Sequence, residues 1–167
     1  LDKKGYMSSE SIQPLLENKL VLIVPVKNDG TIKEFKDMGK AKHPAIGDPA
    51  SVPAGQYARE ALTSLGLWQQ IEGKASLGTN VTQVLNWVGE GSADAGLVYA
   101  TDAALIKDKV TVVAEAPQGT LKKPVIYPIG ILKKAPQPEA AKELAAFLQT
   151  DEAMQVFEKY GFARVKK

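Results

Sequence analysis

The segment GDPASVPAGQYAREAL, residues 47–62, predicts a helix whose first turn could hold an anion. Gly-Asp-Pro is typical of a tight turn, and Ser51 after it is a good helix-capping residue. Pro53 suits the first helical position, because its missing N–H would have no partner there. The next two residues, Ala54 and Gly55, are small and are expected to leave their amides accessible. Such amides and the positive end of the helix dipole together attract anions.

A second segment of the same design is LGTNVTQVLNWVGEG, residues 77–91. Asn80 is the predicted N-cap of a helix, and Gln83 falls three residues later, the spacing of a capping box. The amide of Val81 would then lie at the start of this helix without a partner in the helical hydrogen-bond ladder. The chain therefore predicts two helix starts that each offer backbone donors.

A hydroxyl group is predicted close to these two helix starts. Residues 95–99, AGLVY, read as a short buried strand that ends at Tyr99. In open α/β sheets, ligands bind outside the carboxyl ends of the strands, so Tyr99 could converge with the amides of Ala54 and Val81. On physical grounds alone, a tyrosine at a strand end is more often a packing residue, and both interpretations stay open at this point.

The elements that must position these groups form an alternating series of strands and helices. This alternation predicts an α/β fold with a mostly parallel sheet flanked by helices. The expected strands are residues 20–26, 44–47, 95–99, 110–115 and 125–132. The expected helices are residues 12–17, 53–65, 81–89 and 102–107, followed by two near the C-terminus that are separated at Thr150.

At these residues the chain resembles the substrate-binding protein of ABC importers for molybdate and tungstate, a type II periplasmic-binding-protein family. Four segments carry the resemblance: GDPASVPAGQYAREALTSLGLW, TNVTQVLNWVGEGSADAGLVYATDA, KPVIYPIGIL and FEKYGF. This family holds a tetrahedral dianion between two lobes with backbone amides and hydroxyls, without charged side chains. The resemblance implies that the amides of Ala54 and Val81 and the hydroxyl of Tyr99 bind the anion. Four neighbours would support them: Ser51, Pro53, Gly55 and Asn80.

The resemblance also implies a layout of lobes and hinge. It assigns residues 1–20 to the end of the first lobe, residues 27–124 to the anion-binding second lobe, and residues 133–167 to C-terminal helices. Residues 21–26 and 125–132 would be two strands that cross between the lobes and form the hinge.

The serine loops with which the family's first lobe begins have no counterpart in this chain. Ser8, Ser9 and Ser11 do not match their positions and are expected to form a loop and cap before the helix at residues 12–17. The chain is therefore expected to be a fragment that lacks most of the first lobe. A fragment of this kind should bind molybdate weakly and self-associate through apolar surface that is normally covered.

The implied function is extracytoplasmic capture of molybdate or tungstate, in the periplasm or on a lipid anchor, with delivery to a membrane permease. The metal would be bound only as its oxyanion, so no direct metal ligand and no cofactor is expected. Molybdate and tungstate have the same charge and similar size, so the residues do not separate them. Two alternatives stay open: a binding protein for sulfate or another oxyanion, and a cytoplasmic oxyanion-sensing domain of a transcription regulator.

Composition argues against several other classes of protein. The chain of 167 residues has 21 basic and 19 acidic residues, and its lysines are spread rather than concentrated, which disfavours nucleic-acid binding. It has no cysteine and no apolar run long enough to span a bilayer. No targeting segment is expected within these residues, which says nothing about the compartment of the protein. The single histidine, His43, is expected in an exposed loop. With no nucleophile elbow and no paired acid and base, no enzymatic activity is expected.

Overall fold

The computed structural model describes residues 2–165, which form two compact units. The larger unit comprises residues 19–124. The smaller unit combines residues up to 18 with the chain from 125 onward. Every group of the candidate anion site belongs to the larger unit.

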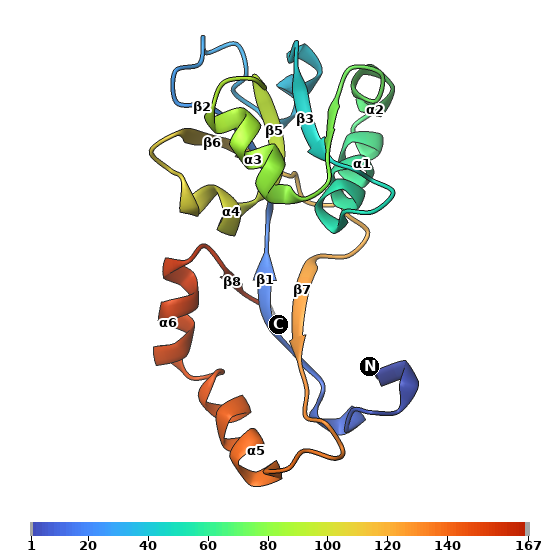
Figure 1. Ribbon diagram of the computed structural model, residues 1–167, viewed down its shortest axis with the longest axis vertical. Coiled ribbons are helices and arrows are strands. Elements are labelled where there is room, and N and C mark those ends of the chain that lie inside the picture. The colour runs from blue at the N-terminus through green and yellow to red at the C-terminus, as the bar shows by residue number, and fades with distance from the viewer. Residues whose placement is uncertain (1, 166–167) are drawn as a thin grey trace. The chain divides into compact units, whose positions relative to one another are not determined.

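A five-stranded sheet forms the centre of the larger unit (Figure 1). Its strand order is β4-β3-β5-β2-β6. The strands are β2 (Leu20–Pro25), β3 (Pro44–Gly47), β4 (Ser76–Gly78), β5 (Ala95–Tyr99) and β6 (Val110–Glu115).

The sheet is mixed, which corrects the expectation of a mostly parallel one. Strand β3 runs parallel to β4 and β5, whereas β2 runs antiparallel to both β5 and β6. The reason lies in where β2 enters the sheet. Leu20, its first residue, pairs with Tyr99, the last residue of β5, so the two strands must run in opposite directions.

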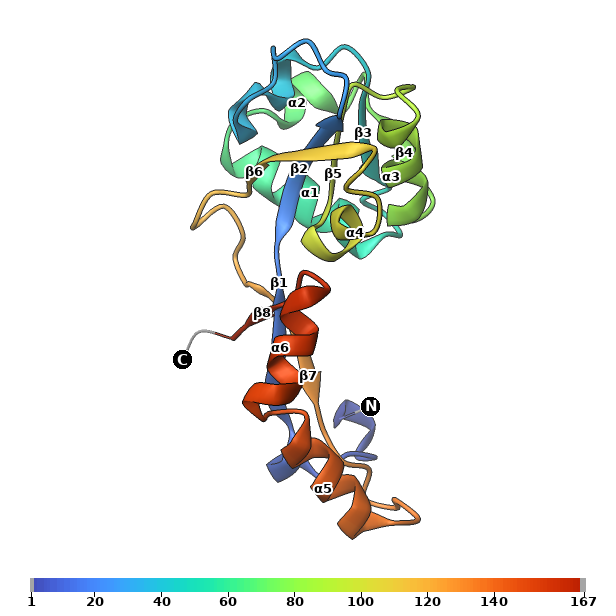
Figure 2. The same cartoon turned by 90° about the vertical axis from the view of Figure 1, so that its left-hand side faces the viewer.

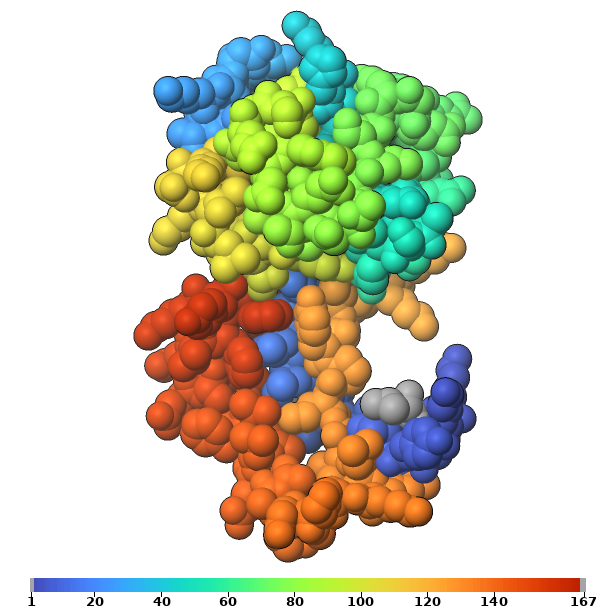
Figure 3. Space-filling view, viewed as in Figure 1, coloured from blue at the N-terminus to red at the C-terminus, as the bar shows by residue number. Residues whose placement is uncertain are grey.

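Helices cover both faces of this sheet, as expected (Figures 1 and 2). On one face, α1 (Pro53–Ser64), α2 (Trp68–Ile71) and the 3-10 segment η3 (Phe35–Lys40) pack against alternate residues of β2. On the other face, α3 (Val81–Gly89) and α4 (Ala100–Leu105) pack against the remaining ones. Figure 3 shows the side chains of α3, in yellow-green, covering that second face. Strand β2 is therefore almost entirely apolar, because neither of its faces meets water.

The smaller unit is built on a three-stranded antiparallel sheet in the order β7-β1-β8. Its strands are β1 (Gln13–Asn18), β7 (Val125–Ile129) and β8 (Ala163–Arg164). Its helices are α5 (Pro138–Phe147) and α6 (Asp151–Lys159), with short 3-10 segments η1 (Asp2–Lys4) and η2 (Ser9–Ser11) near the start of the chain.

Strand β1 corrects two expectations from the sequence. Residues 12–17 were expected to be a helix, but from Gln13 onward they form a strand, in which Leu16 and Asn18 are buried with the period of two that strands require. Pro14 disfavours a helix interior and lies here next to an irregularity in the pairing. The strand that pairs with β7 is β1, whereas the segment expected to cross, residues 21–26, lies mostly in β2, inside the larger sheet.

The serines before β1 do not cap the helix expected at residues 12–17, because a strand forms there instead. Ser11 instead ties two chain segments together: its hydroxyl donates to the Ser8 carbonyl (2.6 Å) and accepts the N–H of Ile131 (2.8 Å). This contact holds the chain before β1 against the segment that follows β7.

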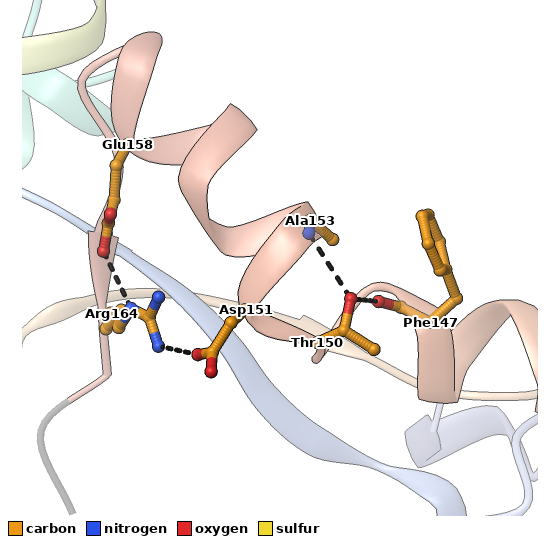
Figure 4. Close-up of polar contacts among 6 residues, drawn as sticks. All are labelled: Phe147, Thr150, Asp151, Ala153, Glu158 and Arg164. Carbon is orange, nitrogen blue, oxygen red and sulfur yellow. Dashed lines mark hydrogen bonds and ion pairs between the residues drawn. The ribbon is translucent and has the colours of Figure 1, made fainter.

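The break between the two C-terminal helices is confirmed at Thr150 (Figure 4). Its hydroxyl accepts the N–H of Ala153 at 3.4 Å and donates to the Phe147 carbonyl at 2.7 Å, which closes α5 and opens α6. Arg164 in β8 forms ion pairs with Asp151 (2.7 Å) and Glu158 (2.8 Å), so both ends of α6 are tied to the last strand.

Candidate oxyanion site

The carboxyl ends of three strands meet at one edge of the larger unit's sheet. Gly47 at the end of β3 is in register with Gly78 at the end of β4, and β5 runs parallel beside β3 up to Tyr99. The N–H of Asp48 donates to the Gly78 carbonyl (2.8 Å). This hydrogen bond joins the loops that follow β3 and β4 directly at the strand ends. These loops lead directly into α1 and α3, and both helix starts therefore lie at the same edge of the sheet.

Helix α1 begins at Pro53, as predicted, but Ser51 does not cap it. The N-cap residue is Val52, and the Ser51 hydroxyl lies 3.3 Å from a carboxylate oxygen of Asp48. Asp48 organises this turn, because its carboxylate accepts the N–H of Ala50 (2.9 Å) and its carbonyl accepts that of Val52 (2.8 Å). The helix therefore starts one residue later than a Ser51 cap would require.

The first turn of α1 is pressed against the end of β3. A Cβ atom placed on Gly55 would lie 2.0 Å from the Gly47 carbonyl oxygen, so only glycine allows this approach. Ala54 is 1% exposed, which is less open to solvent than its small side chain suggested. The first ladder bond runs from the Gln56 N–H to the Val52 carbonyl. Among residues 2–165, no acceptor pairs with the N–H groups of Ala54 and Gly55.

Helix α3 begins as predicted, at Val81 behind an Asn80 cap. The Asn80 side chain accepts the N–H of Gln83 (2.9 Å), whereas the Gln83 side chain turns back to the N–H of Thr79 (2.8 Å) instead of that of Asn80. Val81 is half-buried, and within the described part of the chain its N–H has no acceptor. Both helix starts thus present backbone donors that the fold itself does not use.

Tyr99 occupies the predicted position at the end of β5 and is half-buried. Its ring meets that of Tyr57, from α1, edge to face, with 6.4 Å between the ring centroids. Its N–H donates to the carboxylate of Asp102 (3.1 Å), and the next N–H, that of Ala100, donates to the Lys19 carbonyl (2.9 Å). Tyr57 had no expected role, and only the fold brings it against Tyr99.

Two carboxylates lie close in sequence to these donors, and both accept backbone N–H groups. Asp48 holds the turn before α1, and Asp102 holds the end of β5. Burial raises the pKa of Asp102, and the hydrogen bond from the Tyr99 N–H opposes that rise. The predicted anion contacts themselves are two backbone amides and one hydroxyl, so the site offers donors and no side-chain charge.

A hollow of about 770 Å³ lies elsewhere in the same unit. It borders the beginnings of β3 and β5, the edge of the sheet opposite to the helix starts, and His43 and Asp94 are part of its lining. His43 is exposed in a loop, as expected, and its N–H donates to Asp94 (2.9 Å). Among residues 2–165, no cluster of histidines and carboxylates could hold a metal ion, and no helix is long and apolar enough to cross a membrane.

Comparison with known proteins confirms the resemblance. The family described as bacterial extracellular solute-binding protein matches residues 1–163. A Bacillus subtilis protein named as an ABC transporter substrate-binding lipoprotein is 44% identical over 95% of this chain and 60% of its own length. The molybdate-binding protein of Haemophilus influenzae is 36% identical over 98% of this chain and 65% of its own length. The chain thus spans less than two thirds of the length of these relatives.

Solved structures confirm the fold. The substrate-binding domain named for a molybdenum ABC transporter of Clostridium difficile has a TM-score of 0.88 and 35% identity, and the match covers 99% of this chain and 72% of that one. The periplasmic molybdate-binding protein of Azotobacter vinelandii has a TM-score of 0.80 at 21% identity, with 99% and 73% coverage, and shows the same fold. The chain therefore belongs to the bacterial extracellular solute-binding proteins and has the α/β fold of type II periplasmic binding proteins.

Proposed function

We propose that the full-length gene product captures molybdate or tungstate outside the cytoplasm and delivers it to the permease of an ABC importer. One observation carries the proposal: the starts of α1 and α3 bring N–H groups without protein acceptors to the edge of the sheet where β5 ends in Tyr99. Relatives named as molybdate-binding proteins and as a substrate-binding lipoprotein support the ligand and the location.

In this proposal the amides of Ala54 and Val81 and the hydroxyl of Tyr99 donate hydrogen bonds to the oxyanion. Ala54 is almost without solvent contact. When the anion binds, its N–H would therefore give up few hydrogen bonds to water and would gain a charged acceptor. Hydrogen bonds to charged groups are shorter and stronger than those between neutral groups. The supporting residues shape the two helix starts: Pro53 and Gly55 in α1, Asn80 before α3, and Ser51 through its contact with Asp48.

A site whose backbone groups only donate selects for fully deprotonated dianions. The N–H groups of Ala54 and Val81 cannot accept the proton that hydrogen phosphate carries, and a Tyr99 hydroxyl that accepted this proton would no longer donate to the same oxygen. A buried donor without an acceptor is costly, and phosphate should therefore bind more weakly than molybdate. Such a site needs neither a cofactor nor a direct metal ligand, and its proposed donors include no catalytic group.

The proposed mechanism is closure of two lobes around the anion, as in hinged binding proteins. The strands that we assign to the hinge are β1 and β7, because they pair with each other along five registered positions. Strand β2 stays within the sheet of the larger unit and does not take this role.

Isothermal titration of the full-length gene product at neutral pH tests the proposal. The parent protein should bind molybdate and tungstate, bind sulfate more weakly and bind phosphate least. The variant Tyr99→Phe should lose about tenfold to a hundredfold in molybdate affinity, because a hydrogen bond to a charged partner contributes about 1.5–3 kcal/mol. Absence of heat with both metal oxyanions, or tighter binding of phosphate, would contradict the proposed function.

A further inference from the structure

Two hydrogen bonds at the junction of β5 and α4 point to opposite sides of the chain and help to hold it. Successive N–H groups of a strand alternate in direction. The N–H of Ala100 donates across to the Lys19 carbonyl, next to β2, at 2.9 Å. The N–H of Tyr99 takes the other direction, and its acceptor is the carboxylate of Asp102 in the first turn of α4, at 3.1 Å. A backbone carbonyl beside β2 and a side chain of α4 thus both fix the backbone where β5 meets α4.

The position of Asp102 disfavours a charged carboxylate unless an interaction compensates for this cost. It is half-buried, and burial opposes its charge. It also lies three residues from Tyr99, whose hydroxyl the proposed function assigns to a dianion, and like charges repel. A short helix of six residues gains little from one acidic cap. The feature that this carboxylate does provide is the acceptor for the Tyr99 N–H.

We propose that Asp102 is a positioning residue for the oxyanion site, which acts by fixing the backbone of Tyr99 so that its hydroxyl meets the anion. The direction of a side chain follows from its backbone, and Tyr99 is both the last residue of β5 and the N-cap of α4. The ring has a second support in Tyr57, which holds it from the side of α1. The inference rests on the proposed function, because it assigns Asp102 a role toward the same ligand.

A double-mutant cycle in the full-length gene product tests this role, with molybdate as the titrant. The variants are Asp102→Ala, Tyr99→Phe and the two combined, and Asp102→Asn is a fourth variant that keeps an acceptor oxygen without the charge. Asp102→Ala should weaken molybdate binding about threefold to tenfold when Tyr99 is present, in the range of coupling between contacting residues. In the Tyr99→Phe background, the same change should alter affinity less than about twofold, because the hydroxyl it positions is gone.

Two further variants, Asp102→Asn and Asp108→Ala, show whether a loss of affinity comes from the position of Tyr99 or from general damage to the fold. Asp102→Asn should restore the affinity of the parent or exceed it, since it keeps the hydrogen bond and removes a negative charge. Asp108→Ala is the matched control: Asp108 is exposed, lines the hollow at the opposite edge of the sheet, and should leave affinity unchanged. Thermal melting of each variant shows whether it is folded under the conditions of the titration.

Several outcomes would overturn the inference. Equal losses from Asp102→Ala in both backgrounds would mean that Asp102 acts on the fold in general and not through Tyr99. A loss in Asp102→Asn as large as that in Asp102→Ala would exclude the acceptor role. A parent protein that does not bind molybdate would overturn the proposed function itself, and this result is distinguishable because it precedes any variant.

Discussion

The contact between α1 and β3 gives a sharp test of how the site is built, through the substitution Gly55→Ala. The added Cβ would lie 2.0 Å from the Gly47 carbonyl oxygen and 2.5 Å from its carbon, where real Cβ contacts do not fall below 3.0 Å. The obstacle is backbone on both sides, so no side chain can rotate away. The start of α1 must therefore move by about 1 Å or more, a displacement that overpacked cores accommodate at a cost of about 1–3 kcal/mol or above.

This displacement should be visible in both stability and binding. Urea unfolding of the full-length gene product should show a free energy of unfolding that is lower by about 2–3 kcal/mol, at the upper end of what overpacking costs. Molybdate affinity should fall as well, because the Ala54 amide moves with the helix start.

The matched control is Gly73→Ala. A Cβ on Gly73 meets nothing within 4 Å, and Gly73 does not have a positive φ. This variant should keep the stability and the affinity of the parent. If Gly55→Ala behaved like Gly73→Ala in both measurements, the close approach of α1 to β3 would not be what shapes the first turn of α1.

Three further predictions concern the cap of α3, a buried carboxylate and the surface of the smaller unit. Asn80→Ala removes the acceptor for the Gln83 N–H, and it should cost about 1 kcal/mol in urea unfolding and weaken molybdate binding. The hydrogen bond from Lys40, with those from the Lys33 and Glu34 amides, lowers the pKa of Asp37 to about 2. Its stabilising effect should be complete above the unfolded value of 3.8 and should fall as the pH drops toward 2, and Asp37→Asn should remove this part of the pH dependence. The 167-residue chain on its own should self-associate in light scattering, because α5, α6 and the residue after α6 expose large apolar side chains: Leu144, Phe147, Val156 and Tyr160. A parent stability that is flat across that acid range, or a strictly monomeric chain, would contradict the respective prediction.

Local signals in the sequence were enough to predict the two helix starts and the strand end at which the candidate site is proposed. Proline at a first helical position and asparagine three residues before a glutamine are signals that work within one turn of helix, and Pro53 and Asn80 hold those positions. The end of β5 at Tyr99 also followed from a short apolar run. Ser51 does not cap α1 because the carboxylate of Asp48 organises the turn before it, and the helix begins after Val52. Serine and aspartate can both play such a role, so the residue types alone do not decide between them.

Features that depend on contacts between distant residues could not be predicted in this way. Leucine-rich residues 12–17 fit a helix or a strand, and only the pairing with β7 selects the strand. Strand β4, with three residues, is too short for a periodic signal. The direction of β2 is set by its first residue, Leu20, pairing with the last residue of β5. The sequence of β2 itself does not indicate this direction. Tyr57 meets Tyr99 from α1, far away in the sequence, so this contact emerges only in the folded chain.

The most direct test of the central claim is a crystal structure of the full-length gene product with tungstate, located by the anomalous scattering of the metal. We expect one tungstate ion within hydrogen-bond distance of the Ala54 and Val81 amide nitrogens and the Tyr99 hydroxyl. Tungstate bound elsewhere, for example in the hollow beside His43 at the opposite edge of the sheet, would contradict it.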